Sequence, residues 1–138
     1  RVIGSLVDSG CVVVACGGGG IPVRREGTEY VGVEAVIDKD FASALLANQL
    51  GVDDFAICTA VDAVSLNYGT PEQIDLRELT IEEAEKYLAE GQFGKGSMAP
   101  KVQAAINFLR NGGRRVVITS LARLRDAVDG RAGTVITR

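Results

Sequence analysis

The sequence predicts an α/β fold, a three-layer αβα sandwich around a mainly parallel central sheet. Short apolar runs at 11–16, 55–60 and 115–119 lack the alternation of half-exposed strands, which favours strands covered on both faces. Segments with helical spacing separate these runs, and strands that alternate with helices are typical of layered α/β proteins. We therefore expect these three strands to be adjacent and parallel in one sheet.

The first predicted element is a helix over 1–9, which Gly10 ends. The strand at 11–16 follows and leads directly into four consecutive glycines, Gly17, Gly18, Gly19 and Gly20. Glycine has no Cβ, so the backbone can press against a ligand, and open α/β sheets place anionic ligands where a strand ends. We interpret the glycines as a loop for phosphate or a small anion, with a tight turn as the alternative. Neither a P-loop nor a dinucleotide fingerprint is present.

Three more helices are predicted at 40–50, 81–90 and 101–110 from their apolar spacing. Thr80 and Glu83 form the capping-box pattern at the start of the second of these helices.

Between the strand at 55–60 and the helix at 81–90, residues 61–79 are predicted to be one long loop. Loops of this length in compact domains are usually functional or disordered, and this one starts at the carboxyl end of a strand. It contains Asp62 and Tyr68, so we keep both a ligand role and a simple surface excursion open. A final strand is predicted over 133–137, after a further helix.

The composition limits the classes of function. The 138 residues fit one domain, 1–138, and 46% are hydrophobic, which argues against disorder. The net charge of -3 disfavours a nucleic-acid partner, and no apolar stretch approaches the length of a membrane span. We expect a cytoplasmic protein without membrane partners. Because the chain starts at Arg1 inside a predicted helix, we expect it to be a piece of a longer or processed protein.

The chain has three cysteines and no histidine. Cys11, Cys16 and Cys58 lie in apolar runs and are predicted to be small buried residues in a reducing cytosol. The absence of histidine excludes Ser-His and Cys-His catalysis and histidine metal sites, and no metal ligands are predicted. Chemistry would therefore depend on Lys, Arg, Asp, Glu and backbone dipoles.

Two lysines are predicted at the starts of helices, where the helix dipole disfavours a cation. Lys39 lies between Asp38 and Asp40, and Lys101 begins the helix at 101–110. One aspartate can cap a helix, and a surface charge cluster is the alternative explanation for the triplet. A bound polyanion would explain both lysines. Phosphoryl transfer uses such cations together with glycine dipoles and a carboxylate.

These motifs resemble those of carbamate kinases in the amino-acid kinase superfamily, and the similarity is to the C-terminal half of such enzymes. The segments that carry the resemblance are in family order and at family spacing: Ala15–Pro22, Glu34–Asp40, Thr59–Val64, Glu90–Val102 and Ile118–Leu121.

The resemblance implies a mainly parallel αβα sandwich, a homodimer, and a kinase that interconverts ATP plus carbamate with ADP plus carbamoyl phosphate. It implies Mg²⁺ as cofactor and a place in arginine breakdown. The family's C-terminal half binds the nucleotide, and its N-terminal half is missing here. A non-catalytic nucleotide-binding fragment, or a related enzyme with another small acid as acceptor, remain alternatives, and we expect no turnover by this chain alone.

The resemblance also implies roles for individual residues. Lys39 would reach the transferred phosphoryl group, Asp40 would hold the catalytic lysines, and Lys101 would neutralise the nucleotide phosphates. The glycine loop would lie near the carbamoyl and phosphate groups. The implied nucleotide pocket comprises Thr59, Ala60, Val61, Asp62, Val64, Tyr68 and Met98.

Overall fold

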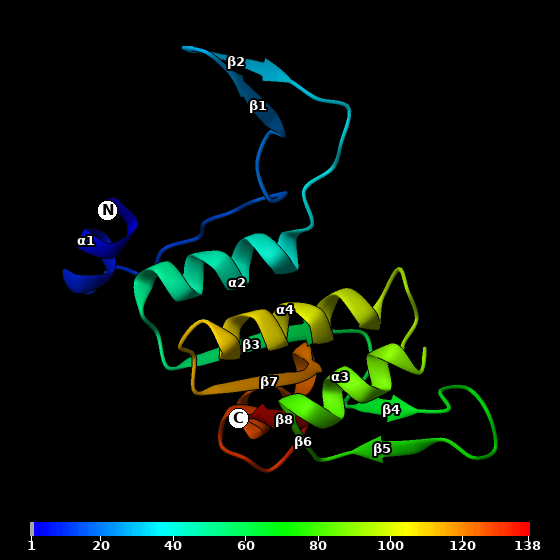
Figure 1. Ribbon diagram of the computed structural model, residues 1–138. Helices are drawn as coiled ribbons and strands as arrows, with labels where there is room; N and C mark the ends of the chain where they lie inside the picture. The colour runs from blue at the N-terminus through cyan, green and yellow to red at the C-terminus, as the bar shows by residue number, and fades with distance from the viewer. Residues whose placement is uncertain (1) are drawn as a thin grey trace.

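A four-stranded sheet in the order β3-β7-β8-β6 forms the centre of the computed structural model, which describes residues 2–138 (Figure 1). The strands are β3 (Asp54–Thr59), β6 (Glu78–Thr80), β7 (Arg115–Ser120) and β8 (Thr134–Thr137). β3 pairs with β7 and β6 with β8 in parallel, whereas β7 and β8 are antiparallel. The sheet is thus mixed and mostly parallel. The predicted neighbouring parallel strands at 55–60 and 115–119 are confirmed, as is the strand at 133–137.

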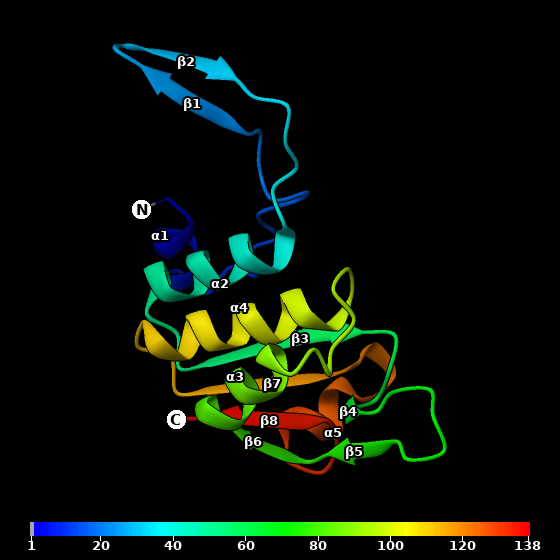
Figure 2. The ribbon, with the colours of Figure 1, turned by 45° about the vertical axis from the view of Figure 1, so that its right-hand side comes forward.

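Helices pack on both faces of this sheet. Val116 and Ile118 of β7 belong to the main core, which includes residues of α3 (Ile81–Ala89) and α4 (Met98–Arg110). Val117 points to the other face, where it packs with Ala127 of α5 (Leu124–Val128), a helix preceded by the short 3-10 helix η1 (Leu121–Arg123). α2 (Lys39–Leu50) packs chiefly on α4, farther from the sheet (Figure 2).

The helix ends follow the local sequence. The Asp38 side chain caps α2 by accepting hydrogen bonds from Asp40 N and Phe41 N, and Gly51 ends the helix in a left-handed conformation. The capping box of Thr80 and Glu83 is confirmed at α3. α4 begins at Met98, earlier than the predicted 101–110. Proline is tolerated in a first helical turn because the missing N–H has no intrahelical acceptor there.

The predicted strand at 11–16 is wrong. These residues, which follow α1 (Val2–Asp8), form no strand, and Val12 and Val14 are each 98% exposed. Among the described residues no strand pairs with this segment, and a strand needs a neighbour to satisfy its backbone hydrogen bonds. The predicted helix at 1–9 is present as α1, although Arg1 lies outside the described residues.

The predicted burial of the cysteines is wrong for Cys11 and Cys58, which are exposed, while Cys16 is half-buried. Cys11 belongs to the uncovered segment at 11–16. Cys58 lies on β3, which is an edge strand of the sheet. The face of the sheet that α5 covers stays partly open at β3, because α5 is only five residues long.

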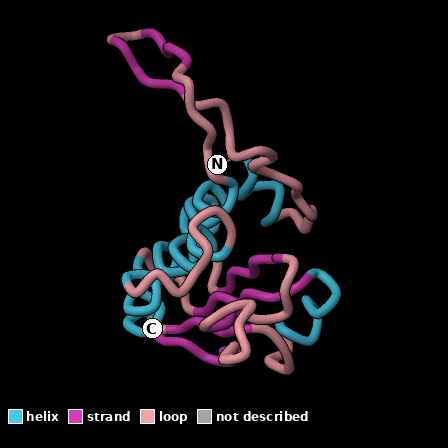
Figure 3. Tube along the Cα trace, turned by 90° about the vertical axis from the view of Figure 1, so that its right-hand side faces the viewer, coloured by secondary structure: helices cyan, strands magenta, loops and turns pink. Residues whose placement is uncertain are grey.

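Two antiparallel hairpins lie in segments without a predicted strand. β1 (Val23–Glu26) and β2 (Glu29–Gly32) form a wholly exposed hairpin that projects from the rest of the molecule (Figure 3). β4 (Val64–Leu66) and β5 (Ile74–Leu76) form the second, so the predicted long loop at 61–79 is wrong. Strands of three or four residues carry too little periodicity to be recognised in a sequence. None of the helices described here is long and apolar enough to cross a membrane.

Candidate functional site

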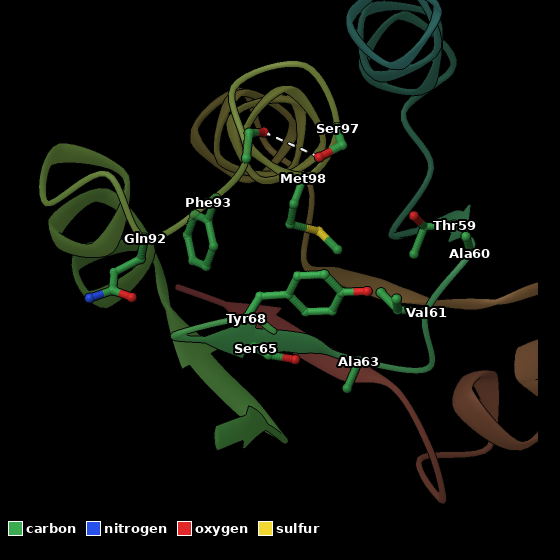
Figure 4. Close-up of a pocket in the computed structure, with 11 residues that line it drawn as sticks. Thr59, Ala60, Val61, Ala63, Ser65, Tyr68, Gln92, Phe93, Ser97 and Met98 are labelled. Carbon is green, nitrogen blue, oxygen red and sulfur yellow. Dashed lines mark hydrogen bonds between the residues drawn. The ribbon is translucent and has the colours of Figure 1, made fainter. Parts of the chain in front are cut away.

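A pocket of about 220 Å³ lies at the carboxyl end of β3 (Figure 4). Thr59 ends β3 and forms one wall together with Ala60 and Val61. Tyr68, in the turn between β4 and β5, and Met98, the first residue of α4, face each other across the pocket. Ligands of open α/β sheets characteristically bind beyond the carboxyl ends of strands.

The lining of the pocket suits a flat aromatic ligand. Phe93, which is 5% exposed, lies beside Met98 and Tyr68, and the two aromatic rings and the thioether provide polarisable apolar contacts. Ser65 and Gln92 add polar groups at the edge. An apolar slot with a few polar groups is typical of small-molecule sites.

The structure brings part of the predicted pocket together. Thr59, Ala60, Val61, Tyr68 and Met98 all line it. Their contacts with a ligand stay predictions.

Two other predicted pocket residues lie elsewhere. Val64 is fully buried in the core, and its N–H donates to Thr134 Oγ1 at 2.8 Å. The backbone oxygen of Asp62 accepts a hydrogen bond from Thr119 Oγ1 at 3.2 Å, and Asp62 does not line the pocket. Both follow β3 closely in the sequence, but the chain turns into β4 there.

Sequence reasoning did not single out Phe93, Gln92 and Ser65. Phe93 and Gln92 belong to the motif Glu90–Val102, where an aromatic residue between glycines was the available signal. Ser65 lies in a strand too short to be recognised.

A charged cluster lies where α2 and α4 meet. Asp40 Oδ2 is 2.8 Å from Lys101 Nζ and 3.7 Å from Lys39 Nζ, so the three side chains converge as predicted. The side chains of Lys101 and Asp40 are 11% and 13% exposed, whereas that of Lys39 is 65% exposed. The cluster thus contains one fixed, buried ion pair and one lysine that extends into solvent.

The glycine loop lies against the start of α2 and does not line the pocket. A Cβ at Gly19 would be 2.9 Å from the oxygen and Cγ2 of Ile37, and Gly19 has a φ of 101°. Any side chain at this position would therefore clash with the segment that leads to Asp40. Cys16 Sγ also approaches Ala42 O of α2, at 4.0 Å.

α4 connects the pocket and the charged cluster. Met98 lines the pocket, and Lys101 follows it by three residues, about 4.5 Å along a helix axis. A ligand with an aromatic ring beside Met98 could extend a charged tail toward Lys101 and Lys39.

Carboxylates in this region do not form a metal cage. Asp38 caps α2 and Asp40 binds two lysines. The described part of the chain holds no group of three or more His, Cys, Asp or Glu residues that could hold a metal ion.

The structure is thus a mostly parallel α/β protein with a pocket at the carboxyl end of β3 and a cluster of two lysines and one aspartate where α2 meets α4. The chain belongs to the amino acid kinase family, whose profile matches residues 1–120.

Within that family, the chain is similar to carbamate kinases, as the sequence motifs predicted. It is 52% identical to the carbamate kinase of Thermoplasma acidophilum, over 99% of this chain and 45% of that protein. It is 51% identical to that of Oenococcus oeni, over 100% of this chain and 44% of the other.

A solved structure, carbamate kinase from Giardia lamblia bound to AMP-PNP, has a TM-score of 0.94 and 42% identity, covering 99% of this chain and 48% of the other. The chain therefore spans less than half the length of these relatives.

Proposed function

We propose that this chain is the C-terminal, nucleotide-binding half of a carbamate kinase. The full-length protein would transfer a phosphoryl group reversibly between ATP and carbamate. The observation that carries this proposal is the aromatic pocket joined by α4 to the cluster of Lys101, Asp40 and Lys39. The Giardia relative with AMP-PNP supports an adenine nucleotide as the ligand.

The three charged residues would have different roles. The base would lie between Tyr68 and Met98, and the phosphates would extend along the start of α4. Lys101, held by Asp40, would neutralise the phosphates from a fixed position. Lys39, largely exposed, would reach the transferred group. Preplaced cations of this kind stabilise the charge that develops in phosphoryl transfer.

Mg²⁺ would enter as part of the substrate. The described carboxylates do not fit a dedicated protein site, and Mg²⁺ commonly binds nucleotide phosphates with few protein ligands. The steps assigned to this chain therefore concern its lysines and Asp40 only.

The exposed apolar surface near the start of the chain supports the proposal that another half of the protein packs against it. Val12, Val14 and Leu45 are 98%, 98% and 60% exposed, and the chain spans about 45% of its curated relatives. We propose that the other half covers this surface, completes the three-layer sandwich and contributes most of the carbamate site. By relation to the family, the whole protein would be a homodimer.

A non-catalytic nucleotide-binding fragment is the second candidate. The observation that favours it is the position of the glycine loop, which does not line the pocket and is largely open, because a Cβ at Gly17, Gly18 or Gly20 would meet none of the described residues within 4 Å. A fragment of this kind would bind nucleotide but form no ATP.

The full-length protein tests the proposed activity. ATP formation from ADP and carbamoyl phosphate, followed with a coupled enzyme assay, is expected. Acetyl phosphate serves as the alternative donor in a parallel reaction. ATP formed only with acetyl phosphate, or with neither donor, would contradict a carbamate kinase.

A further inference from the structure

Tyr68 forms one side of the pocket although 64% of its surface is exposed. Burial alone therefore does not hold its ring in place. The position of the ring depends on the turn at 67–73, which joins β4 to β5. This turn has internal hydrogen bonds between Asn67 and Thr70, and Asn67 has a left-handed φ of 50°.

Two glutamine side chains hold the backbone on either side of Tyr68. The N–H of Asn67 donates to Gln92 Oε1 at 3.1 Å. The N–H of Gly69 donates to Gln73 Oε1 at 3.0 Å. Gln92 itself lines the pocket (Figure 4), and its bond to Asn67 places it beside the end of β4. The residues before and after Tyr68 are thus each fixed by a side-chain amide oxygen.

Asp75 determines which way the amide of Gln73 points. Asp75 Oδ1 accepts hydrogen bonds from Gln73 Nε2 at 3.0 Å and from Ser65 Oγ at 2.7 Å. An ionised carboxylate can only accept, so the nitrogen of Gln73 faces Asp75 and its oxygen faces Gly69. Ser65 and Asp75 are directly opposite each other in the β4–β5 pairing, which places the carboxylate beside the pocket wall.

We propose that Gln73, oriented by Asp75, and Gln92 are positioning residues that hold Tyr68 across the pocket and thereby set its affinity for a nucleotide base. This inference rests on the proposed nucleotide-binding function. A wall that is placed before the ligand arrives costs less conformational entropy on binding than one that must be ordered.

Amide hydrogen exchange measured by NMR on the 138-residue chain tests the positioning without any ligand. Gln73→Leu removes the acceptor of the Gly69 N–H, and we expect exchange at Gly69 to accelerate by about 3- to 10-fold, the effect of one net hydrogen bond. Gln103→Leu is the matched control, because the Gln103 side chain bonds Asn107 on the exposed side of α4, within the same helix. Unchanged exchange at Gly69 in Gln73→Leu would overturn the proposal.

ADP titration by calorimetry tests the consequence for binding. Gln73→Leu should weaken ADP binding by about 3- to 10-fold, and it should have no further effect in a Tyr68→Ala background, because coupled residues are not additive. Asp75→Leu should resemble Gln73→Leu, and Asp75→Asn, which keeps an oxygen toward Gln73, should restore most of the affinity. Equal effects of Gln73→Leu in both backgrounds would overturn the inference.

The two measurements separate the inference from the proposed function. A wild-type chain that binds no ADP contradicts nucleotide binding, and the affinity claim fails with it. The exchange of Gly69 then still decides whether Gln73 holds the turn. A chain that binds ADP with the same affinity when Gln73 is replaced contradicts the positioning role alone.

Discussion

At the scale of single residues, the ion pair of Asp40 and Lys101 should contribute both to the stability of the fold and to the proposed activity. Both side chains are nearly buried, and the 2.8 Å contact joins α2 to α4. A lysine at an exposed helix start would contribute little to stability, which is what the sequence alone suggests. Burial changes this expectation, because removing Lys101 leaves the buried Asp40 carboxylate with the longer, 3.7 Å contact to the exposed Lys39 in place of its 2.8 Å partner.

Lys101→Ala in the full-length protein should therefore lower both activity and stability. Loss of one electrostatic contact to a developing charge typically costs at least about 10²-fold in rate. Breaking a buried pair costs about 3–5 kcal/mol when the remaining charge has no other partner, and we expect a loss near the lower end because Lys39 stays 3.7 Å from Asp40. Coupled ATP formation and urea unfolding measure the two effects.

Lys39→Ala is the matched comparison for Lys101→Ala. Because the Lys39 side chain is 65% exposed, this variant should lose activity with little change in unfolding free energy. If Lys101→Ala turned over as fast as the unsubstituted full-length protein, the contact between Lys101 and Asp40 would be structural only.

The stability of the folded chain should depend on pH through the carboxyl group of Asp75. Hydrogen bonds from Ser65 and then Gln73, with a smaller contribution from Arg77, lower the pKa of Asp75 below its ordinary 3.8. A carboxyl whose pKa is lowered by folding stabilises the protein above its unfolded pKa. That contribution to stability is lost as the pH falls through the pKa that the carboxyl has in the folded state.

Urea unfolding of the wild type and Asp75→Asn, compared between pH 7 and pH values below about 3.8, tests this linkage. The wild type should be more stable at pH 7, and the difference should shrink as the pH falls. A difference that stays constant with pH would show that the charge of Asp75 does not contribute.

At the scale of elements, the connection from α4 to β7 depends on close packing at Gly113. A Cβ at Gly113 would overlap the ring of Phe108, which is fully buried and packs against Phe55 with ring centroids 5.4 Å apart. Because the ring is fully buried against Phe55, either the packed ring or the backbone would have to shift.

Gly113→Ala should destabilise the chain by about 1–3 kcal/mol, the usual cost of overpacking a core. Gly32→Ala is the control, because nothing lies within 4 Å of a Cβ at Gly32 on the exposed strand β2. The midpoints of urea unfolding report both effects. Equal midpoints for the two variants would contradict the packing account.

The elements also show what could be predicted from the sequence. α2 and α3 were recognisable because Asp38, Thr80 and Gly51 are local signals that act through adjacent backbone groups. The strand at 11–16 was not correctly predicted, since apolar character shows that a segment needs cover but not whether a partner strand is present. β4 and β5 were missed because three residues are too few for a pattern.

In the candidate site, too, some residues could be identified from the sequence and others could not. Lys39 and Lys101 were identifiable from their unusual charge at helix starts, and Asp40, Tyr68 and Met98 through the family resemblance. Gln73, Gln92 and Asp75 were not singled out, because their role depends on hydrogen bonds across a turn and between distant segments. Side-chain amides in a polar turn have no distinguishing sequence pattern.

At the scale of the whole molecule, the apolar surface of α1, residues 11–16 and α2 has a physical consequence. Large exposed apolar patches favour association, and Val2, Val12 and Val14 are 76%, 98% and 98% exposed. We expect the 138-residue chain to self-associate as its concentration rises, which sedimentation velocity would detect. Val12→Ser with Val14→Ser should reduce the association, and a strictly monomeric wild-type chain at high concentration would contradict the prediction.

We propose that these 138 residues contain a nucleotide pocket but only part of a catalytic site. Titration of the purified chain with ADP, monitored by calorimetry, tests it most directly. We predict weak, saturable binding with one site per chain, which Tyr68→Ala weakens while Gln103→Leu does not. Absence of binding at millimolar ADP, or saturable binding that Tyr68→Ala leaves unchanged, would contradict the account.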